Sequence, residues 1–246
     1  ISTCPRISTP DPRNPCDTAA ARLPPAESPT RMTGPALART QLVVWAVKPQ
    51  TFREAAAPAA PHTGSALHLS VMAGIRFGDI AVATGSHRVV RCMPNTPALV
   101  GKGMSGLFAA PAVTPEDRAL AEAVVATTGE YLWVEHEKQL DAVTALSGSG
   151  PAYMFFFMEA MTQAGVRMGL SREQAYKLSV ATFIGAGELA RASDEPPEVL
   201  RQRVTSKGGT THAAITAMEA SNIKPLFEQA LHAARTRAHE LGQEFG

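Results

Sequence analysis

The hydrophobic pattern of this chain changes near residue 137. Between residues 42 and 92, three short apolar runs rich in β-branched residues, LVVWAV, ALHLSV and RVVRC, are separated by stretches long enough to hold a crossover helix. This alternation is typical of parallel strands in an α/β sheet. From about residue 137 onward, the pattern predicts long helices almost throughout. The sequence therefore predicts a Rossmann-type α/β sheet domain followed by an all-α domain.

Two further apolar segments extend the predicted sheet. The sequences MSGLFA (104–109) and YLWVE (131–135) suit edge strands, and the segment between them suits a helix. Thr114 is a good N-cap for this helix, and Pro115 suits its first position, because proline lacks the N–H group that would be unpaired there. We expect the sheet domain to span residues 39–136.

The helical domain is predicted to span residues 137–246. Pro151 can start a helix that Gly169 stops, and SREQ at 171–174 forms a capping box for a second helix. The run of Phe and Met at 154–161 is apolar around most of the helix circumference, which implies burial on more than one side. We therefore expect a homodimer, with burial inside one ordinary subunit core as the alternative.

The overall composition narrows the classes of function. Of the 246 residues, 45% are apolar and 18% are charged, which suits a globular protein. A net charge of +1, from 23 basic and 22 acidic residues, provides no long-range field for binding nucleic acid or an anionic membrane. The chain has no membrane-spanning apolar stretch and no signal-peptide core, so we expect a cytoplasmic protein. The cysteine and histidine spacings favour neither a disulfide framework nor a metal site.

Residues 1–38 differ from both predicted domains. They are rich in proline, with scattered Ser, Thr and Arg, and they lack the periodicity of a helix or a strand. We expect this segment to be irregular and to add nothing to a core.

Three loops contain residues suited to ligand binding. Lys48 follows the first predicted strand and Asn95 follows the third, so both are expected at the carboxyl edge of the sheet, where open α/β folds bind ligands. The alternatives are a solvated lysine and a rigid turn that the neighbouring prolines hold extended. The sequence SGSGPAY (147–153) precedes a helix, and it suits either an anion site or a tight joint between domains.

The sequence VTSKGGTTHAAI (204–215) has the features of an anion-binding helix start. The glycine pair at 208–209 allows close approach to the backbone N–H groups that a helix leaves unpaired at its first turn. The hydroxyl groups of Ser206, Thr210 and Thr211 provide further donors. The stretch suits a carboxylate or a phosphate, and the alternative is a helix capped by one of its own threonines.

The segments AVKPQ, RCMPNTPALVGKG, LDAVTALSGSGPAY and VTSKGGTT, in this order and separation, resemble pyrroline-5-carboxylate reductase, the enzyme family that completes proline synthesis. The similarity extends from about Gln41 to Leu241. It implies a dinucleotide-binding domain for NADPH or NADH, and a helical domain that dimerises and can build larger rings. It also implies hydride transfer to the cyclic imine of L-1-pyrroline-5-carboxylate. A protonated imine is already electrophilic, so positioning carries most of the acceleration.

The resemblance also implies roles for individual residues. The glycine–threonine stretch would hold the substrate carboxylate, Thr211 would be the catalytic residue that hydrogen-bonds the ring nitrogen, and Glu137 would lie near the substrate. The implied substrate-binding residues are Glu137, Ser206, Gly209, Thr210 and Thr211. The implied cofactor-binding residues are Ala46, Val47, Lys48, Pro49, Met93, Asn95, Thr96 and Arg203. No metal is expected.

Two features depart from the family pattern. Lys207 stands where the family has proline, and its cation can help to hold an anion. The family opens with a strand and a G-x-G-x-x-G/A turn for the pyrophosphate, whereas Gly34 is the only glycine before Gly64 in this sequence. We therefore expect the first βαβ unit to be missing, or replaced by residues 1–38 through a shifted frame or a miscalled start, which Ile1 in place of methionine also suggests. A catalytically silent helical dimer that has lost cofactor binding is the alternative function.

Overall fold

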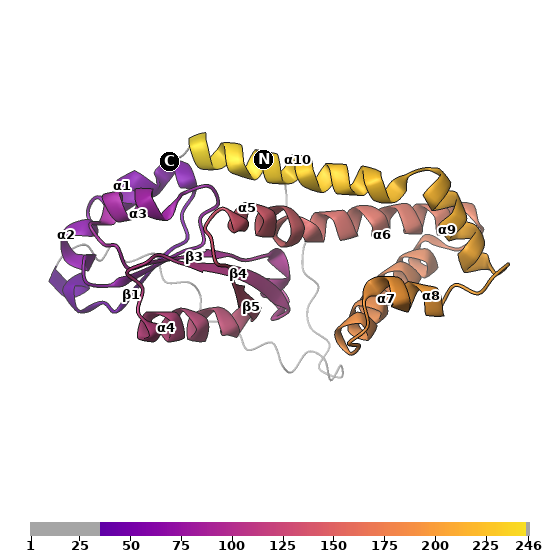
Figure 1. The fold of residues 1–246 in the computed structure, drawn as a ribbon, viewed down its shortest axis with the longest axis horizontal. Helices are drawn as coiled ribbons and strands as arrows, with labels where there is room; N and C mark the ends of the chain where they lie inside the picture. Colours follow the sequence, from indigo (N-terminus) through magenta and orange to yellow (C-terminus); the bar gives the residue numbers. More distant parts are fainter. Residues whose placement is uncertain (1–34, 245–246) are drawn as a thin grey trace, which may run out of the picture. The chain divides into compact units, whose positions relative to one another are not determined.

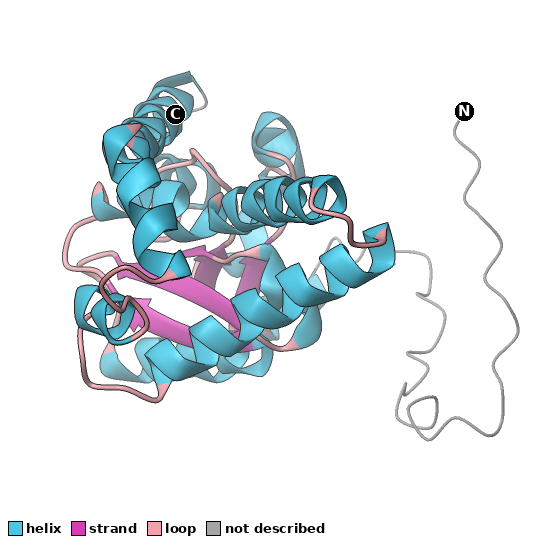
Figure 2. Ribbon diagram, turned by 90° about the vertical axis from the view of Figure 1, so that its right-hand side faces the viewer, coloured by secondary structure: helices cyan, strands magenta, loops and turns pink. Residues whose placement is uncertain are grey.

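The computed structural model describes residues 35–244 (Figures 1 and 2). The expected irregularity of residues 1–34 lies outside the described residues. The last residues of that predicted segment, 35–38, belong to a short 3-10 helix, η1 (Pro35–Arg39), so the predicted irregularity is wrong for them. The predicted domain boundary at residue 137 falls between the last strand and the first long helices.

Five strands form one mixed sheet, and they lie in the order of the sequence. They are β1 (Leu42–Trp45), β2 (Leu67–Ser70), β3 (Val89–Met93), β4 (Gly103–Ala109) and β5 (Gly129–Trp133). The first three strands are parallel, as the apolar runs predict, whereas β4 is antiparallel to β3 and β5 is parallel to β4. The reversal at β4 follows from the short connection at 94–102, because a parallel return needs a crossover of a dozen or more residues. Since β5 pairs with β4, β4 is an inner strand and not the edge strand that the sequence suggested.

Short helices connect the strands. They are η2 (Pro49–Thr51), α1 (Phe52–Ala56), α2 (Ala60–Thr63), α3 (Phe77–Thr84), η3 (Thr96–Val100), α4 (Pro115–Val125) and η4 (Ala126–Thr128). The start of α4 matches the prediction: the Thr114 hydroxyl accepts from the backbone N–H of Asp117, and the Asp117 carboxylate accepts from the N–H of Thr114.

Helices cover both faces of the sheet, and two apolar clusters fill the layers between them (Figure 1). Successive residues of a strand point to opposite faces. Val89 of β3 therefore packs with Phe52 of α1 and Ile80 of α3, whereas Val90 packs with Ala121 of α4. This layering is the α/β architecture that the sequence predicts.

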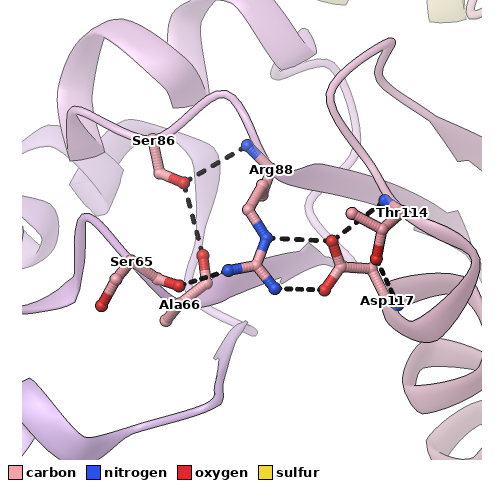
Figure 3. Close-up of polar contacts among 6 residues, drawn as sticks. All are labelled: Ser65, Ala66, Ser86, Arg88, Thr114 and Asp117. Atoms are coloured by element: carbon pink, nitrogen blue, oxygen red, sulfur yellow. Dashed lines mark hydrogen bonds and ion pairs between the residues drawn. The ribbon is translucent and has the colours of Figure 1, made fainter.

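Arg88 joins three segments at the amino-terminal edge of β2 and β3 (Figure 3). Its guanidinium group forms two hydrogen bonds with the Asp117 carboxylate, one from Nε to Oδ2 at 2.9 Å, and Nη1 donates to the carbonyl oxygen of Ser65. The hydroxyl of Ser86 donates to the carbonyl of Ala66 at 3.3 Å. Hydrogen bonding from Arg88 is the main reason that the pKa of Asp117 is lowered. These contacts lie at the sheet edge opposite the predicted ligand loops.

Helices make up the rest of the described chain. They are α5 (Gln139–Val143), the π-helix η5 (Thr144–Gly148), α6 (Gly150–Arg167), α7 (Arg172–Arg191), α8 (Pro197–Arg203), α9 (Thr210–Ala220) and α10 (Ile223–Glu244). As predicted, α6 ends shortly before Gly169, which has a positive φ of 99°, and a capping box of Ser171 and Gln174 starts α7. Within residues 35–244, no helix is long and apolar enough to cross a membrane.

The π-helix η5 lies between α5 and α6. Its wider turn is seen in the hydrogen bond of 2.8 Å from the N–H of Ser149 to the carbonyl of Thr144, five residues earlier. The last helix, α10, starts beside α9 and runs back along α5 and η5 (Figure 1). Its 22 residues give it a length of about 33 Å.

Candidate functional site

Two of the predicted cofactor segments meet at one edge of the sheet. Residues 46–49 follow β1 and residues 94–96 follow β3, and both strands run parallel to β2 between them. Their loops therefore leave the sheet at the same carboxyl-terminal edge. The side chains of Ala46, Val47 and Lys48 are exposed there, so this edge is open.

The loop that follows β2 was not among the predicted ligand loops. Residues 71–75, with the sequence VMAGI, leave the same edge between the two predicted cofactor loops. Gly74 has a φ of 81°, a conformation that favours glycine, and Ala73 is exposed. The signal was present in the sequence, because this loop follows the middle one of three predicted parallel strands.

The side chain of Asn95 forms hydrogen bonds within the protein at both ends. Its Oδ1 accepts from the N–H of Met104 at 2.9 Å. Its Nδ2 lies 3.2 Å from Oγ and 3.4 Å from the carbonyl oxygen of Ser147, in η5. A contact between this residue and a cofactor would therefore come from its backbone or from the loop that it holds.

The stretch SGSGPAY forms a tight joint between the sheet and the helices. A Cβ atom added to Gly148 would lie 2.6 Å from Cε of Met93, at the end of β3. Ser147 is bonded to Asn95, and Oη of Tyr153 donates to the carbonyl of Ala145 at 3.1 Å. Of the two interpretations that the sequence left open, these contacts favour the joint over the anion site.

Glu137 has contacts that the sequence did not suggest. Its Oε1 accepts from the backbone N–H of Phe77 at 2.7 Å and from Nη1 of Arg91 at 3.0 Å. The side chain of Arg91 is 10% exposed and that of Glu137 is 19% exposed. Glu137 therefore ties the start of α3 to β3 within the sheet domain.

The predicted substrate stretch forms the start of α9. Gly208 has a φ of 77°, and Gly209 is the N-cap of the helix without a side-chain cap. The positive φ of Gly208 favours glycine, and a Cβ atom on Gly209 would lie 2.7 Å from Oγ of Ser206, so the serine side chain would have to turn away. Within residues 35–244, no side-chain hydrogen bond caps the start of α9. The alternative of a helix capped by its own threonines is therefore wrong. The N–H groups of the first turn have no partner within the helix, as at other helix starts.

Arg203 lies close to this stretch at the end of α8. Its Nη2 lies 2.6 Å from Oε1 of Glu195, and its side chain is 65% exposed. An exposed ion pair of this kind contributes little to stability, so Arg203 can exchange its partner for a ligand at small cost.

Helix α9 and the loop after β2 lie at opposite ends of α10 (Figure 1). Helix α9 adjoins the start of α10. Near the other end of α10, Gly242 lies against Gly74 and Arg76, and a Cβ atom added to Gly242 would be 3.5 Å from the carbonyl oxygen of Gly74. The length of α10 implies about 30 Å between α9 and the Gly74 loop. Asn95 and Pro97 lie nearer, because they share a pocket with Phe227 and Leu231 in the first half of α10. Within one chain, the predicted substrate residues and cofactor residues are not brought together.

Metal and thiol chemistry have no support in the described part of the chain. No group of three or more His, Cys, Asp and Glu side chains within residues 35–244 is arranged to hold a metal ion. Burial raises the pKa of the Cys92 thiol to about 11, which keeps it protonated near neutral pH and makes it a poor nucleophile.

Comparison with known proteins identifies the family. The family described as pyrroline-5-carboxylate reductase dimerisation matches residues 137–241. A pyrroline-5-carboxylate reductase from Pseudomonas aeruginosa is 45% identical over 213 residues, which cover 86% of this chain and 78% of the relative. The structure of a pyrroline-5-carboxylate reductase from Coxiella burnetii matches with a TM-score of 0.78 and 39% identity, over 82% of this chain and 76% of that chain.

A solved structure with a bound dinucleotide is also similar. The pyrroline carboxylate reductase of Plasmodium falciparum, determined with NADP bound, matches with a TM-score of 0.76 and 32% identity, over 82% of this chain and 77% of that chain. The chain therefore belongs to the pyrroline-5-carboxylate reductase family, the NAD(P)H-dependent oxidoreductases of proline biosynthesis.

Proposed function

We propose that this chain reduces L-1-pyrroline-5-carboxylate to L-proline at sites that two copies of the chain build together. The position of α9, which packs beside the start of α10 and away from the sheet, carries this proposal (Figure 1). Hydride transfer needs both reactants within about 3.5 Å of each other. The substrate residues of one copy must therefore meet the cofactor residues of the other.

Exposed apolar side chains on α6 and α7 support the pairing of two copies. In the single chain, Phe155 is 63%, Phe156 is 68% and Ile184 is 60% exposed. A groove of about 800 Å³ between these helices is lined in part by Phe155, Tyr176 and Ile184. Large exposed apolar patches of this kind mark interaction surfaces, which fits the dimerisation family that matches residues 137–241.

The start of α9 is proposed to hold the substrate. The backbone N–H groups after Gly209 and the hydroxyls of Ser206 and Thr210 would donate to its carboxylate, which the positive end of the helix also attracts. The hydroxyl oxygen of Thr211 would accept from the N–H of the protonated imine and so fix the orientation of the ring. The nearby Lys207 ammonium group would add attraction for the carboxylate.

The described sheet edge fits the nicotinamide half of a dinucleotide. Ala46 and Val47 offer exposed apolar surface to a flat ring, Lys48 offers a cation to the phosphates, and Pro49, Met93 and Thr96 complete this side. When bound, NADPH or NADH supplies the hydride that the imine carbon receives. Arg203 of the other copy would reach the phosphates from the helical side. Glu137 is proposed as a support for the wall of the site, through Arg91 and the start of α3.

Complementation between two defective variants tests the shared site. Ser206→Ala with Thr211→Ala disables the substrate side, and Lys48→Glu disables the cofactor side by repelling phosphate. Each variant alone is expected to have little activity. In mixed dimers, one of the two sites combines an intact substrate side with an intact cofactor side. Co-expression is therefore expected to restore about a quarter of the normal activity if the chains associate at random.

The outcomes of this test separate the alternatives. Activity of the co-expressed pair no higher than that of the separate variants would contradict a site shared between copies. A normal chain that forms dimers but neither turns over nor binds NADPH would favour the catalytically silent dimer instead.

Single substitutions are expected to separate substrate binding from catalysis. Thr211→Ala should lower kcat/KM about tenfold or more, because one hydrogen bond of about 1.5 kcal/mol to the reacting imine is lost. Ser206→Ala should act mainly on KM, because the carboxylate is held equally in the ground and transition states. Steady-state kinetics measure both effects, and unchanged kinetics in Thr211→Ala would end its assigned role.

A further inference from the structure

The hydrogen bonds of Asn95 connect three parts of the molecule. We call Asn95, the N–H of Met104 and residue Ser147 the Asn95 clasp. Through Met104 the clasp closes the base of the loop between β3 and β4, with a bond of 2.9 Å. Through Ser147 it fixes this loop to η5, with contacts of 3.2 and 3.4 Å. One side chain thus links the cofactor side to the start of the helical half.

The tip of the loop above the clasp is exposed. Leu99 is 90% and Val100 is 76% exposed, so their apolar side chains do not anchor it. Gly101 ends η3 with a φ of 68°. Backbone hydrogen bonds from Gly101 to Ala98 and from Lys102 to Pro97 fold the loop on itself. The Asn95 side chain links the folded loop to η5, and it is therefore expected to fix where the loop, and Thr96 within it, lies relative to the sheet edge.

We infer that Asn95 is a positioning residue, which acts through the loop that it holds rather than by touching the cofactor. The inference rests on the proposed function, because Thr96 belongs to the proposed cofactor side. A loop that is already fixed does not have to be ordered when the dinucleotide binds, and such preorganisation increases affinity. The substrate carboxylate is held by another copy of the chain, so its binding should not depend on the clasp.

Two variants of Asn95 remove the hydrogen bonds of the clasp in part or completely. Asn95→Asp keeps an oxygen for the N–H of Met104 but replaces the donor that faces the Ser147 carbonyl. Asn95→Ala removes both ends. Asn222→Asp is the matched control, since it makes the same change of charge at an exposed position between α9 and α10.

Hydrogen exchange and ligand binding together test the inference. In Asn95→Asp, amide exchange of residues 96–101 should rise about tenfold, and the Kd and KM for NADPH should rise about tenfold, as expected when the bound loop conformation is populated about a tenth of the time. The KM for pyrroline-5-carboxylate should stay within about twofold of normal. Asn95→Ala should exceed these effects, and Asn222→Asp should match the unmodified protein.

A merely structural role would lower the amount of active protein without changing the KM for NADPH. Equal exchange of residues 96–101 in Asn95→Asp and the unmodified protein would overturn the inference, whether or not the protein turns over. Faster amide exchange of residues 96–101 together with an unchanged Kd for NADPH would also overturn the inference. Absence of turnover in the unmodified protein would count against the proposed function separately.

Discussion

Arg88 and Asp117 show how one ion pair can serve stability without touching the site. Their side chains are 39% and 3% exposed, respectively, so the carboxylate is buried while water still reaches the guanidinium group. The same carboxylate also caps α4. Because the pair lies at the amino-terminal edge of β2 and β3, we expect its loss to affect folding rather than catalysis.

Asp117→Asn is expected to destabilise the protein in a pH-dependent manner. The pKa of Asp117 is lowered in the folded state, so its ionised form contributes stability above the unfolded pKa of about 4, and this contribution is lost as the pH falls through the folded pKa. Near pH 7 we expect a loss of about 1–2 kcal/mol, less than for a fully buried pair because Arg88 is partly exposed.

Urea unfolding between pH 7 and pH 3 measures this difference. It should shrink as the pH falls below about 4. Asp194→Asn, at an exposed position, is the control and should change little. A difference between Asp117→Asn and the unmodified protein that is the same at every pH would contradict the assignment.

Glu137 and Asn95 mark the limit of what the sequence reveals about single residues. Glu137 was selected through the family resemblance and Asn95 through its place after a predicted strand, and both side chains bond to distant parts of the chain. Partners 46 and 52 positions away cannot be recognised from local sequence. The glycine–threonine stretch was easier to interpret, because the whole turn and helix start lie within eight consecutive residues, 204–211.

Strand β4 packs unusually closely against α5. A Cβ atom added to Gly106 of β4 would lie 2.7 and 2.9 Å from the two Cγ atoms of Val143. Such contacts are too short to form without movement. Glycine at this position therefore sets the distance between the sheet and the first helix of the helical half.

Gly106→Ala is expected to cost about 1–3 kcal/mol of stability, because the added methyl group overpacks this contact. Val143→Ala should partly rescue it in the double variant by making room. Gly78→Ala in α3 is the matched control: nothing lies within 4 Å of its added Cβ, so it should stabilise the protein by about 0.5–1 kcal/mol. Thermal unfolding of all four variants measures these changes in stability. If the effects of Gly106→Ala and Val143→Ala are additive in the double variant, the added methyl group does not overpack against Val143.

Helices and strands were largely predictable from the sequence because their signals are local. Apolar runs gave β1 to β3, and caps and glycines gave the bounds of α4, α6 and α7. The inner position of β4 was missed, since strand order depends on pairing between segments rather than on the segments themselves. The π-helix η5 was also missed, because the sequence TALSG has no feature that separates a wide turn from an ordinary one.

In the single chain, α6 and α7 expose a large apolar surface. This surface includes Phe155, Phe156, Tyr176, Leu178 and Ile184, each at least 57% exposed. The family that matches this region is a dimerisation domain. Self-association of the chain would remove this surface from water.

Ile184→Asp is expected to convert the dimer to monomers. Burying an unpaired carboxylate costs several kcal/mol, so the dimer dissociation constant should rise about a hundredfold or more. Val82→Asp is the control, because Val82 is 88% exposed on α3, in the sheet half. Light scattering at micromolar concentration measures the mass, and a dimer that survives Ile184→Asp unchanged would place the interface elsewhere.

The π-helix η5 fixes the rotational phase between the two halves of the chain. Each residue of an α-helix advances the direction of the side chains by roughly 100°. A π turn takes one residue more than an α turn for nearly the same rotation, so the same five residues in a regular α-helix would turn everything beyond by about that angle. Each half could keep its own packing, but the apolar face of α6 and the start of α9 would point in a new direction. A single turn of unusual helix thus sets the angle at which one chain can meet another.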